Sequence, residues 1–184
     1  MPLPRKRLVR FARCEDGSYS VEAVMILPLL LWVALASMTF IDGYRQQNAN
    51  LRTTYTIADM LSRQSDPVGP RFVDGLGRIH TFLTQGKNET SLRVTVAIWN
   101  EPDGKHELVW SDSTGNAPAP ITDVTLAQLS PSIPALSNGS TAIIVETWMD
   151  YEPVFKIGLS PHRFHHSAIV TPRFRPQLKY EAGA

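Results

Sequence analysis

The longest apolar stretch of the 184-residue chain lies near its N-terminus. Residues 23–41 read AVMILPLLLWVALASMTFI, which is 19 positions without a formal charge. As a helix this run would be roughly 28 Å long, close to the thickness of a bilayer's hydrocarbon core. A buried core helix is usually shorter and has a polar stripe, and the apolar region of a cleaved secretory signal has about 7–15 residues. The pattern therefore predicts a retained single-pass membrane anchor.

The segment after this run, residues 42–65, still has a helical pattern but is polar. Apolar and aromatic positions recur in it at spacings of three and four. We expect this narrow stripe to pack on the protein's own domain, and packing on neighbouring helices in a filament is the alternative. Two prolines and a glycine in SDPVGP (65–70) end the helix and mark a domain boundary. The stripe and its one interruption by Asn are Ile41, Tyr44, Asn48, Leu51, Tyr55 and Ala58, with Leu61 nearby.

Residues 66–184 have the pattern of a small α+β domain. Alternation of apolar and polar residues predicts strands, and capping residues and periodicity predict helices. We expect three or four antiparallel strands with one or two short helices, attached to a long N-terminal transmembrane helix (18–65) that continues outside the membrane. The predicted elements are helices over 71–84, which Gly75 and Gly77 weaken, and 122–129, and strands over 91–99, 107–110, 141–151 and 167–171.

Composition and charge exclude some classes of function for this chain. Hydrophobic residues make up 43% of the chain and charged residues 19%, which excludes wholesale disorder. The net charge of +1 argues against nucleic acid as a partner. Residues 1–17 nevertheless contain five basic and two acidic side chains, a local charge of +3. Basic residues before the apolar run predict a cytoplasmic leader (1–17) and an extracytoplasmic domain (66–184), periplasmic in a bacterium.

The junction between leader and apolar run, CEDGSYSVEAVMILPLLL, contains a recognisable processing layout. A basic leader, Gly17, Glu22 five positions beyond it and then a hydrophobic helix resemble a type IV prepilin. Cleavage after Gly17 would leave an α-amine on Ser18, whose pKa is ordinarily near 8. The Glu22 carboxylate could pair with that amine, its own or a neighbouring subunit's, and set the axial register during assembly. An interfacial Glu that reaches water is the other interpretation.

The finer resemblance is to the TadE-like proteins of tight-adherence (Tad, Flp-type) pilus systems. It rests on residues 15–60, above all on Asp16-Gly17, Val21-Glu22 and Leu27-Pro28 followed by a leucine run. A looser likeness covers residues 145–155, VETWMDYEPVF. The resemblance implies a pseudopilin or minor pilin of the bacterial inner membrane, with a prepilin peptidase, other pilins and Tad assembly proteins as partners. It implies assembly roles for Glu22 and Pro28, and it makes the chain a substrate and not an enzyme.

The sequence contains no pattern typical of catalysis or metal binding. HExxH, GxSxG, Walker A and GxGxxG are absent, and the single Cys14 lies in the leader. We interpret HRFHH (162–166) as a polar loop before a strand, and the pair Asp150 and Glu152 as a solvated strand edge. We therefore expect no cofactor, no metal site and no catalytic residue. The histidines considered are His80, His106, His162, His165 and His166.

Four aromatic residues are candidates for a partner surface: Trp99, Trp110, Trp148 and Tyr151. Their alternative role is that of half-buried strand residues. The segment 156–184 has five basic residues against one acid, and we expect a solvated tail, with contact to anionic lipid as the alternative.

Two other functions compete with the pilin assignment. The first is an uncleaved single-pass protein with a periplasmic ligand-binding or sensory domain, and the second is a membrane-anchored hydrolase. Cleavage after Gly17 separates the pilin class from both.

Overall fold

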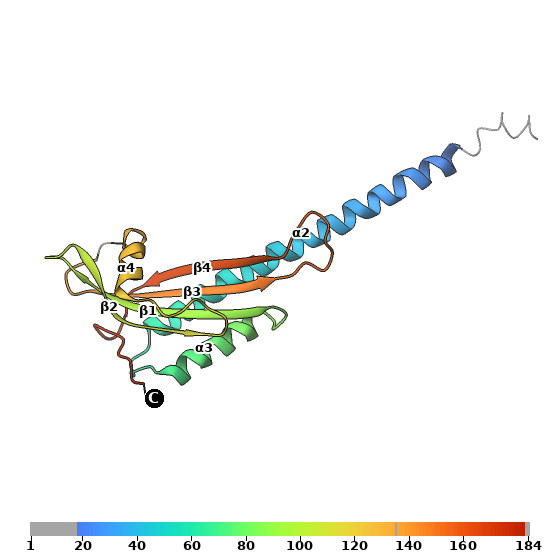
Figure 1. The fold of residues 1–184 in the computed structure, drawn as a ribbon. Coiled ribbons are helices and arrows are strands. Elements are labelled where there is room, and N and C mark those ends of the chain that lie inside the picture. Colours follow the sequence, from blue (N-terminus) through green and yellow to red (C-terminus); the bar gives the residue numbers. More distant parts are fainter. Residues whose placement is uncertain (1–17, 135, 183–184) are drawn as a thin grey trace, which may run out of the picture.

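The computed structural model describes residues 18–134 and 136–182, so the leader predicted over 1–17 lies outside the described residues. It confirms the α+β class: a long apolar helix leads into a four-stranded antiparallel sheet with two short helices (Figure 1). The helix, α2 (Ser18–Ser62), has 45 residues and continues without interruption through Pro28. Its N-terminal half extends away from the sheet, and its C-terminal half lies along it.

The free half of α2 is long and apolar enough to cross a membrane. Its most apolar 18-residue window has a mean hydropathy of 2.4, and 6% of that window is buried within the molecule. Val24 and Met25, for example, are 72% and 74% exposed. A soluble protein rarely leaves so large an apolar surface uncovered, whereas a bilayer covers it fully.

The sheet has the strand order β2-β1-β3-β4, and all neighbouring strands are antiparallel. A register shift in the β1–β2 pair falls between Val96 and Ala97. The strands are β1 (Glu89–Asn100), β2 (Lys105–Thr114), β3 (Thr141–Tyr151) and β4 (His162–Val170), and the other elements are α3 (Pro70–Leu83), α4 (Asp123–Leu129) and the 3₁₀ turn η2 (Ser130–Ser132).

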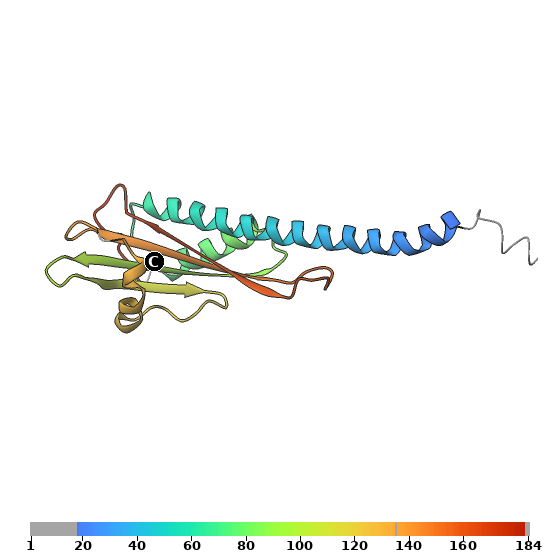
Figure 2. The same cartoon turned by 90° about the horizontal axis from the view of Figure 1, so that it is seen from above.

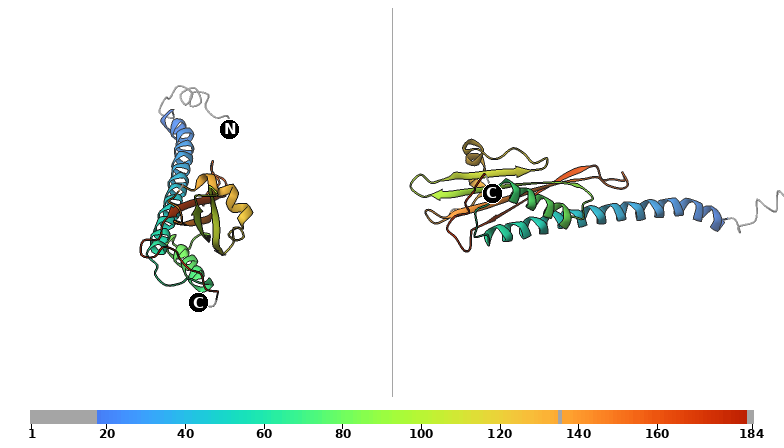
Figure 3. Two further views of the ribbon diagram at one scale, coloured as in Figure 1. Left: turned by 90° about the vertical axis from the view of Figure 1, so that its left-hand side faces the viewer. Right: turned by 90° about the horizontal axis from the view of Figure 1, so that it is seen from below.

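Helices cover both faces of the sheet. α2 packs against β3 and β4 and α3 against β1 and β2, whereas α4 packs on the opposite face (Figures 2 and 3). Burial of apolar side chains on both faces drives this arrangement. The inner core, under α2 and α3, includes Ile57, Leu61, Leu76, Leu92, Val94, Trp110, Ile143 and Val145. The smaller outer core, under α4, includes Ala97, Ile121, Leu126, Ile133, Ala142 and Ile144.

The predicted elements all form, but β1 is slightly longer than expected and β2 and β4 are much longer. The predicted strand over 107–110 is β2, and the one over 167–171 is β4, which already begins at His162. HRFHH is therefore part of a strand, and the prediction of a polar loop is wrong. The reason lies in tertiary pairing, since β4 pairs with β3 along its whole length, from Ile143↔Val170 to Tyr151↔His162.

The buried face of α2 is not the stripe that the sequence indicated. Ile41, Tyr44 and Tyr55 are 53%, 69% and 58% exposed, so the prediction that they pack on the domain is wrong. Of the stripe, Ala58 and Leu61 are buried. A largely polar face lies against the sheet and α3 instead, where Asn50 hydrogen-bonds to His80 and Thr54 to Thr147. It consists of Thr39, Gln46, Asn50, Thr53, Thr54, Ile57 and Ser62, together with Ala58 and Leu61.

The C-terminal segment is anchored to the domain, which contradicts the expectation of a solvated tail. Tyr180 forms an isolated parallel bridge with Val68. The Trp110 indole nitrogen donates to the Leu178 carbonyl at 2.8 Å, and the Tyr180 hydroxyl donates to Asp112 at 2.8 Å. Leu178 is buried in the inner core, and Tyr180 packs against it.

Candidate functional site

The candidate assembly site is the N-terminal end of α2. Gly17 lies outside the described residues, and Ser18 is the first residue of the described helix. Glu22 is exposed, and within 18–134 and 136–182 the structure gives its carboxylate no hydrogen bond or ion pair. It adjoins a shallow apolar surface formed with Ala23, Ile26, Leu27 and Leu30. An unpaired carboxylate next to apolar side chains can accept an ammonium group brought by another segment or another chain.

Pro28 lies in the same exposed half of α2. Proline lacks a backbone N–H, so one turn of the helix keeps an unpaired carbonyl at this point. In lipid such a carbonyl is costly unless a neighbouring group satisfies it. Pro28 is thus a weak point of the helix within its apolar half.

Tyr151 joins the sheet to α2 at the end of the apolar run. Its hydroxyl donates to the Asp42 carboxylate at 3.1 Å and approaches the Thr39 carbonyl at 3.4 Å. Burial, and then the hydrogen bond and negative charge of Asp42, raise the pKa of Tyr151 to about 12. The tyrosine is therefore neutral at physiological pH and acts as a clamp between β3 and α2.

A second polar contact, between α2 and α3, lies deeper in the molecule. The Asn50 side-chain oxygen lies 2.8 Å from His80 Nε2, and both residues are fully buried. Burial lowers the pKa of His80 to about 4, so the imidazole is neutral and Nε2–H donates to Asn50. Thr54 and Thr147 form a neighbouring hydroxyl pair at 2.6 Å, which links α2 to β3.

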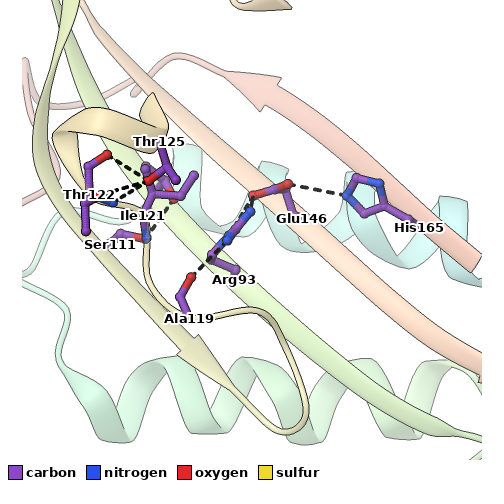
Figure 4. A network of polar contacts seen from close by, with 9 residues as sticks. Arg93, Ser111, Ala119, Ile121, Thr122, Thr125, Glu146 and His165 are labelled. Atoms are coloured by element: carbon purple, nitrogen blue, oxygen red, sulfur yellow. Dashed lines mark hydrogen bonds and ion pairs between the residues drawn. The ribbon is translucent and has the colours of Figure 1, made fainter. Parts of the chain in front are cut away.

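The outer face of the sheet contains a network of charged side chains beside α4 (Figure 4). Arg93 contacts Glu146 through two nitrogens, at 2.8 and 2.6 Å, and donates to the Ala119 carbonyl at 2.9 Å. His165 lies 3.4 Å from the second Glu146 oxygen and stacks on Trp148 at 4.9 Å. The guanidinium carbon of Arg93 lies 5.2 Å from the centre of the Trp148 ring. Each group thus has a partner, and the network fixes the loop after β2 on the sheet.

The four candidate aromatic residues do not form one exposed surface. Trp110 and Tyr151 lie on the face covered by α2 and α3, and Trp148 lies on the opposite face with Arg93 and His165. They are 8%, 3% and 8% exposed. Trp99 lies apart from them and packs on His106 with ring centres 4.6 Å apart. A partner surface built from these four residues is therefore contradicted.

The histidines are distributed over several separate environments. His106 Nδ1 lies 2.9 Å from the Ser130 hydroxyl, but no carboxylate within the described part of the chain pairs with this imidazole. Asp150 pairs with Arg163 at 3.3 Å, whereas Glu152 is exposed beyond the end of β3, so the two carboxylates do not share a strand edge. Across residues 18–134 and 136–182, no group of three or more His, Cys, Asp or Glu side chains is placed to hold a metal ion.

Sequence reasoning missed the polar contacts of α2, namely Asp42–Tyr151, Asn50–His80 and Thr54–Thr147. A signal was present: polar and small residues recur at spacings of three and four at 39, 43, 46, 50 and 53. Hydrophobic periodicity alone ignores such a stripe, because it weights only apolar positions.

No protein-family model, curated protein or solved structure matches the chain. The resemblance to TadE-like proteins therefore rests on the sequence motif.

Proposed function

We propose that the protein is a TadE-like pseudopilin or minor pilin that takes part in assembly of tight-adherence pili. In this proposal its N-terminus is cytoplasmic and its domain periplasmic, a prepilin peptidase cuts after Gly17, and the free half of α2 enters or primes the pilus. Glu22 then pairs with the new α-amine of Ser18 or of a neighbouring subunit. The chain is a structural component and not an enzyme.

The observation that carries this proposal is the division of α2 into two halves. The domain holds residues 39–62 through buried contacts, whereas residues 21–38 contact little of the molecule. An apolar helix of this kind is stable only in lipid or among other apolar helices. A subunit that moves from membrane to filament needs such a helix, with its domain attached beyond the apolar part.

The outer face of α2 adds support. Tyr44 and Tyr55 are exposed on the half that lies along the sheet. Because this face does not pack on the domain, it is free for the filament alternative, in which neighbouring helices cover it. Aromatic side chains bring large contact areas to such interfaces.

The carboxylate at position 22 gives a direct test. Glu22→Ala is expected to leave cleavage intact and to reduce piliation strongly, because the ion pair that sets register is lost. Glu22→Gln keeps the shape and should have the same effect. Piliation is counted by electron microscopy, and Glu101→Gln, an exposed position in the β1–β2 turn, is the matched control. Normal piliation in both Glu22 variants would remove the assembly role of the carboxylate.

A bulky substitution at Gly17, the predicted cleavage site, separates peptidase cleavage from membrane insertion. Gly17→Leu should block cutting, because only a small residue enters the peptidase site in extended form, and should leave membrane insertion unchanged. Immunoblots of membrane fractions would show a longer chain in the same amount. A chain of mature length would contradict processing at this bond.

One observation favours the alternative of an uncleaved anchor with a ligand-binding domain. An open hollow of about 900 Å³ lies at the end of the sheet far from the membrane helix, lined in part by Trp99, His106, Ser130 and Ile133. An aromatic ring beside polar groups suits a small amphiphilic ligand. Uncleaved protein in cells with active prepilin peptidase would favour this function.

A further inference from the structure

The loop between β3 and β4, residues 152–161, exposes two consecutive apolar side chains to a large extent. Val154 is 77% exposed and Phe155 is 43% exposed. They follow the buried Pro153, and Lys156 next to them is exposed. Two consecutive exposed apolar residues with a cation beside them form the kind of amphipathic loop that can enter a membrane interface.

This loop lies against α2 where the apolar run ends. A side-chain carbon at Gly158 would lie 3.6 Å from the Phe40 ring, and one at Gly43 would lie 3.1 Å from a Leu159 methyl. The Tyr151 hydroxyl donates to Asp42 at the same level, 3.1 Å away. Figures 1 and 2 show the loop as the part of the domain that reaches farthest toward the N-terminal end of α2.

The position along α2 sets the depth of the loop in the bilayer. The uncharged run ends at Ile41 and the first charge follows at Asp42. Because 19 helical residues span roughly 28 Å, about the hydrocarbon thickness, residues 40–43 lie at its outer boundary. Phe40 and Tyr44, 51% and 69% exposed, lie where aromatic side chains concentrate at membrane interfaces.

We propose that the β3–β4 loop is a membrane-contact element that inserts Val154 and Phe155 into the interface of the bilayer that α2 crosses. Lys156 then lies at the level of the lipid phosphates, its alkyl chain along the apolar boundary. The occupant is lipid, because the loop that carries the exposed pair lies against α2 at Phe40, where the exposed apolar surface of the helix ends. Together with the Tyr151 clamp, the loop fixes the tilt of the domain over the membrane. This inference goes beyond pilus assembly and applies equally to a cleaved and an uncleaved chain.

The test uses nitroxide labels on the full chain in vesicles of phosphatidylcholine and phosphatidylglycerol. In a Cys14→Ser background, single cysteines replace Val154, Phe155, Leu30 and Val124. Leu30, 61% exposed, reports the span, and Val124, 74% exposed on α4, is the matched control outside it. Collision rates with oxygen, which dissolves in lipid, and with a water-soluble nickel chelate give the depth of each label.

The oxygen-to-nickel ratio at 154 and 155 is expected to exceed that at 124 several-fold and to approach the ratio at 30. If the labels at 154 and 155 give the same ratio as the label at 124 while the label at 30 is in lipid, the loop does not contact the membrane. The proposal would then be overturned, although α2 would still span the bilayer. A water-exposed label at 30 would overturn both. Dipolar broadening between labels at 155 would show that a second copy covers the loop, which would also overturn lipid contact.

Discussion

Two glycines in α3 lie two positions apart in very different surroundings. A side-chain carbon at Gly77 would lie 2.7 Å from the Thr114 methyl group of β2, whereas one at Gly75 meets nothing within 4 Å. Thr114 cannot rotate away freely, because its hydroxyl donates to Asp74 at 2.9 Å. Gly77 therefore allows α3 to approach the sheet closely, and Gly75 only weakens the helix.

This contrast predicts opposite effects of the same substitution. Gly75→Ala should raise the free energy of unfolding by about 0.5–1 kcal/mol through helix propensity. Gly77→Ala gains the same propensity but overpacks the α3–β2 contact, which typically costs about 1–3 kcal/mol. Urea unfolding of the detergent-solubilised chain measures both. Equal stabilisation by the two variants would contradict the close approach at Gly77.

The buried His80 predicts a loss of stability in mild acid. Burial lowers its pKa from the ordinary 6.5 to about 4, so the folded imidazole stays neutral while the unfolded one binds a proton near pH 6.5. Unfolding therefore takes up a proton between these values, and stability falls as the pH drops through this window. His80 alone should make the protein roughly 2 kcal/mol less stable at pH 5 than at pH 7, by linkage.

The control for this effect is His80→Gln, which retains a donor for Asn50 but does not titrate. Burial also lowers the pKa of His106 and His166, so some acid sensitivity should persist in the variant. The prediction concerns the difference between the two proteins, measured by urea unfolding at pH 7 and pH 5. Parallel pH profiles would contradict a neutral, buried His80.

At the scale of elements, polar contacts attach the packed half of α2 to the rest of the domain. Tyr151 of β3 clamps the end of this half near the apolar run. Farther along the helix, Asn50–His80 links α2 to α3 and Thr54–Thr147 links it to β3. Such pairs fix the rotation of a helix more tightly than apolar contacts alone, since a rotated helix would leave buried polar groups unpaired.

Removal of one hydroxyl tests the clamp. Tyr151→Phe should lower stability by about 1 kcal/mol, the typical worth of a hydrogen bond, and should speed amide exchange around residues 39–46 of α2. Tyr180→Phe is the matched control, which loses a bond to Asp112 but should leave exchange in that part of α2 unchanged. Hydrogen exchange with mass spectrometry measures both. Unchanged exchange in Tyr151→Phe would contradict the clamp.

The sequence predicted the positions of helices and strands better than it predicted which of their faces are buried. Alternating apolar residues located β1 and β3, and the capping residue Thr122 located α4. The full length of β4 and the buried face of α2 were not predictable in the same way, because pairing with β3 and buried hydrogen bonds decide them. The aromatic candidates show the same limit, since sequence alone did not distinguish a buried Trp110 from an exposed one.

At the scale of the whole molecule, the chain joins an apolar helix to a domain that holds the other half of that helix. Glu22 lies at the start of the apolar half, and the Tyr151–Asp42 hydrogen bond lies at its end. In the proposed function, the segment between them moves from the membrane into the filament. The motif over residues 15–60 and the looser likeness over 145–155 were the sequence signals for the proposed function, and Glu22 is exposed. The domain itself, with its paired charges, offers a rigid support for that helix.

Processing at Gly17 is tested most directly by the N-terminus and intact mass of the protein from native membranes. We expect a chain that begins at Ser18 and lacks the mass of residues 1–17. A chain that still begins at Met1 or Pro2, in cells whose prepilin peptidase is active, would contradict this expectation and would favour an uncleaved membrane anchor with a ligand-binding domain.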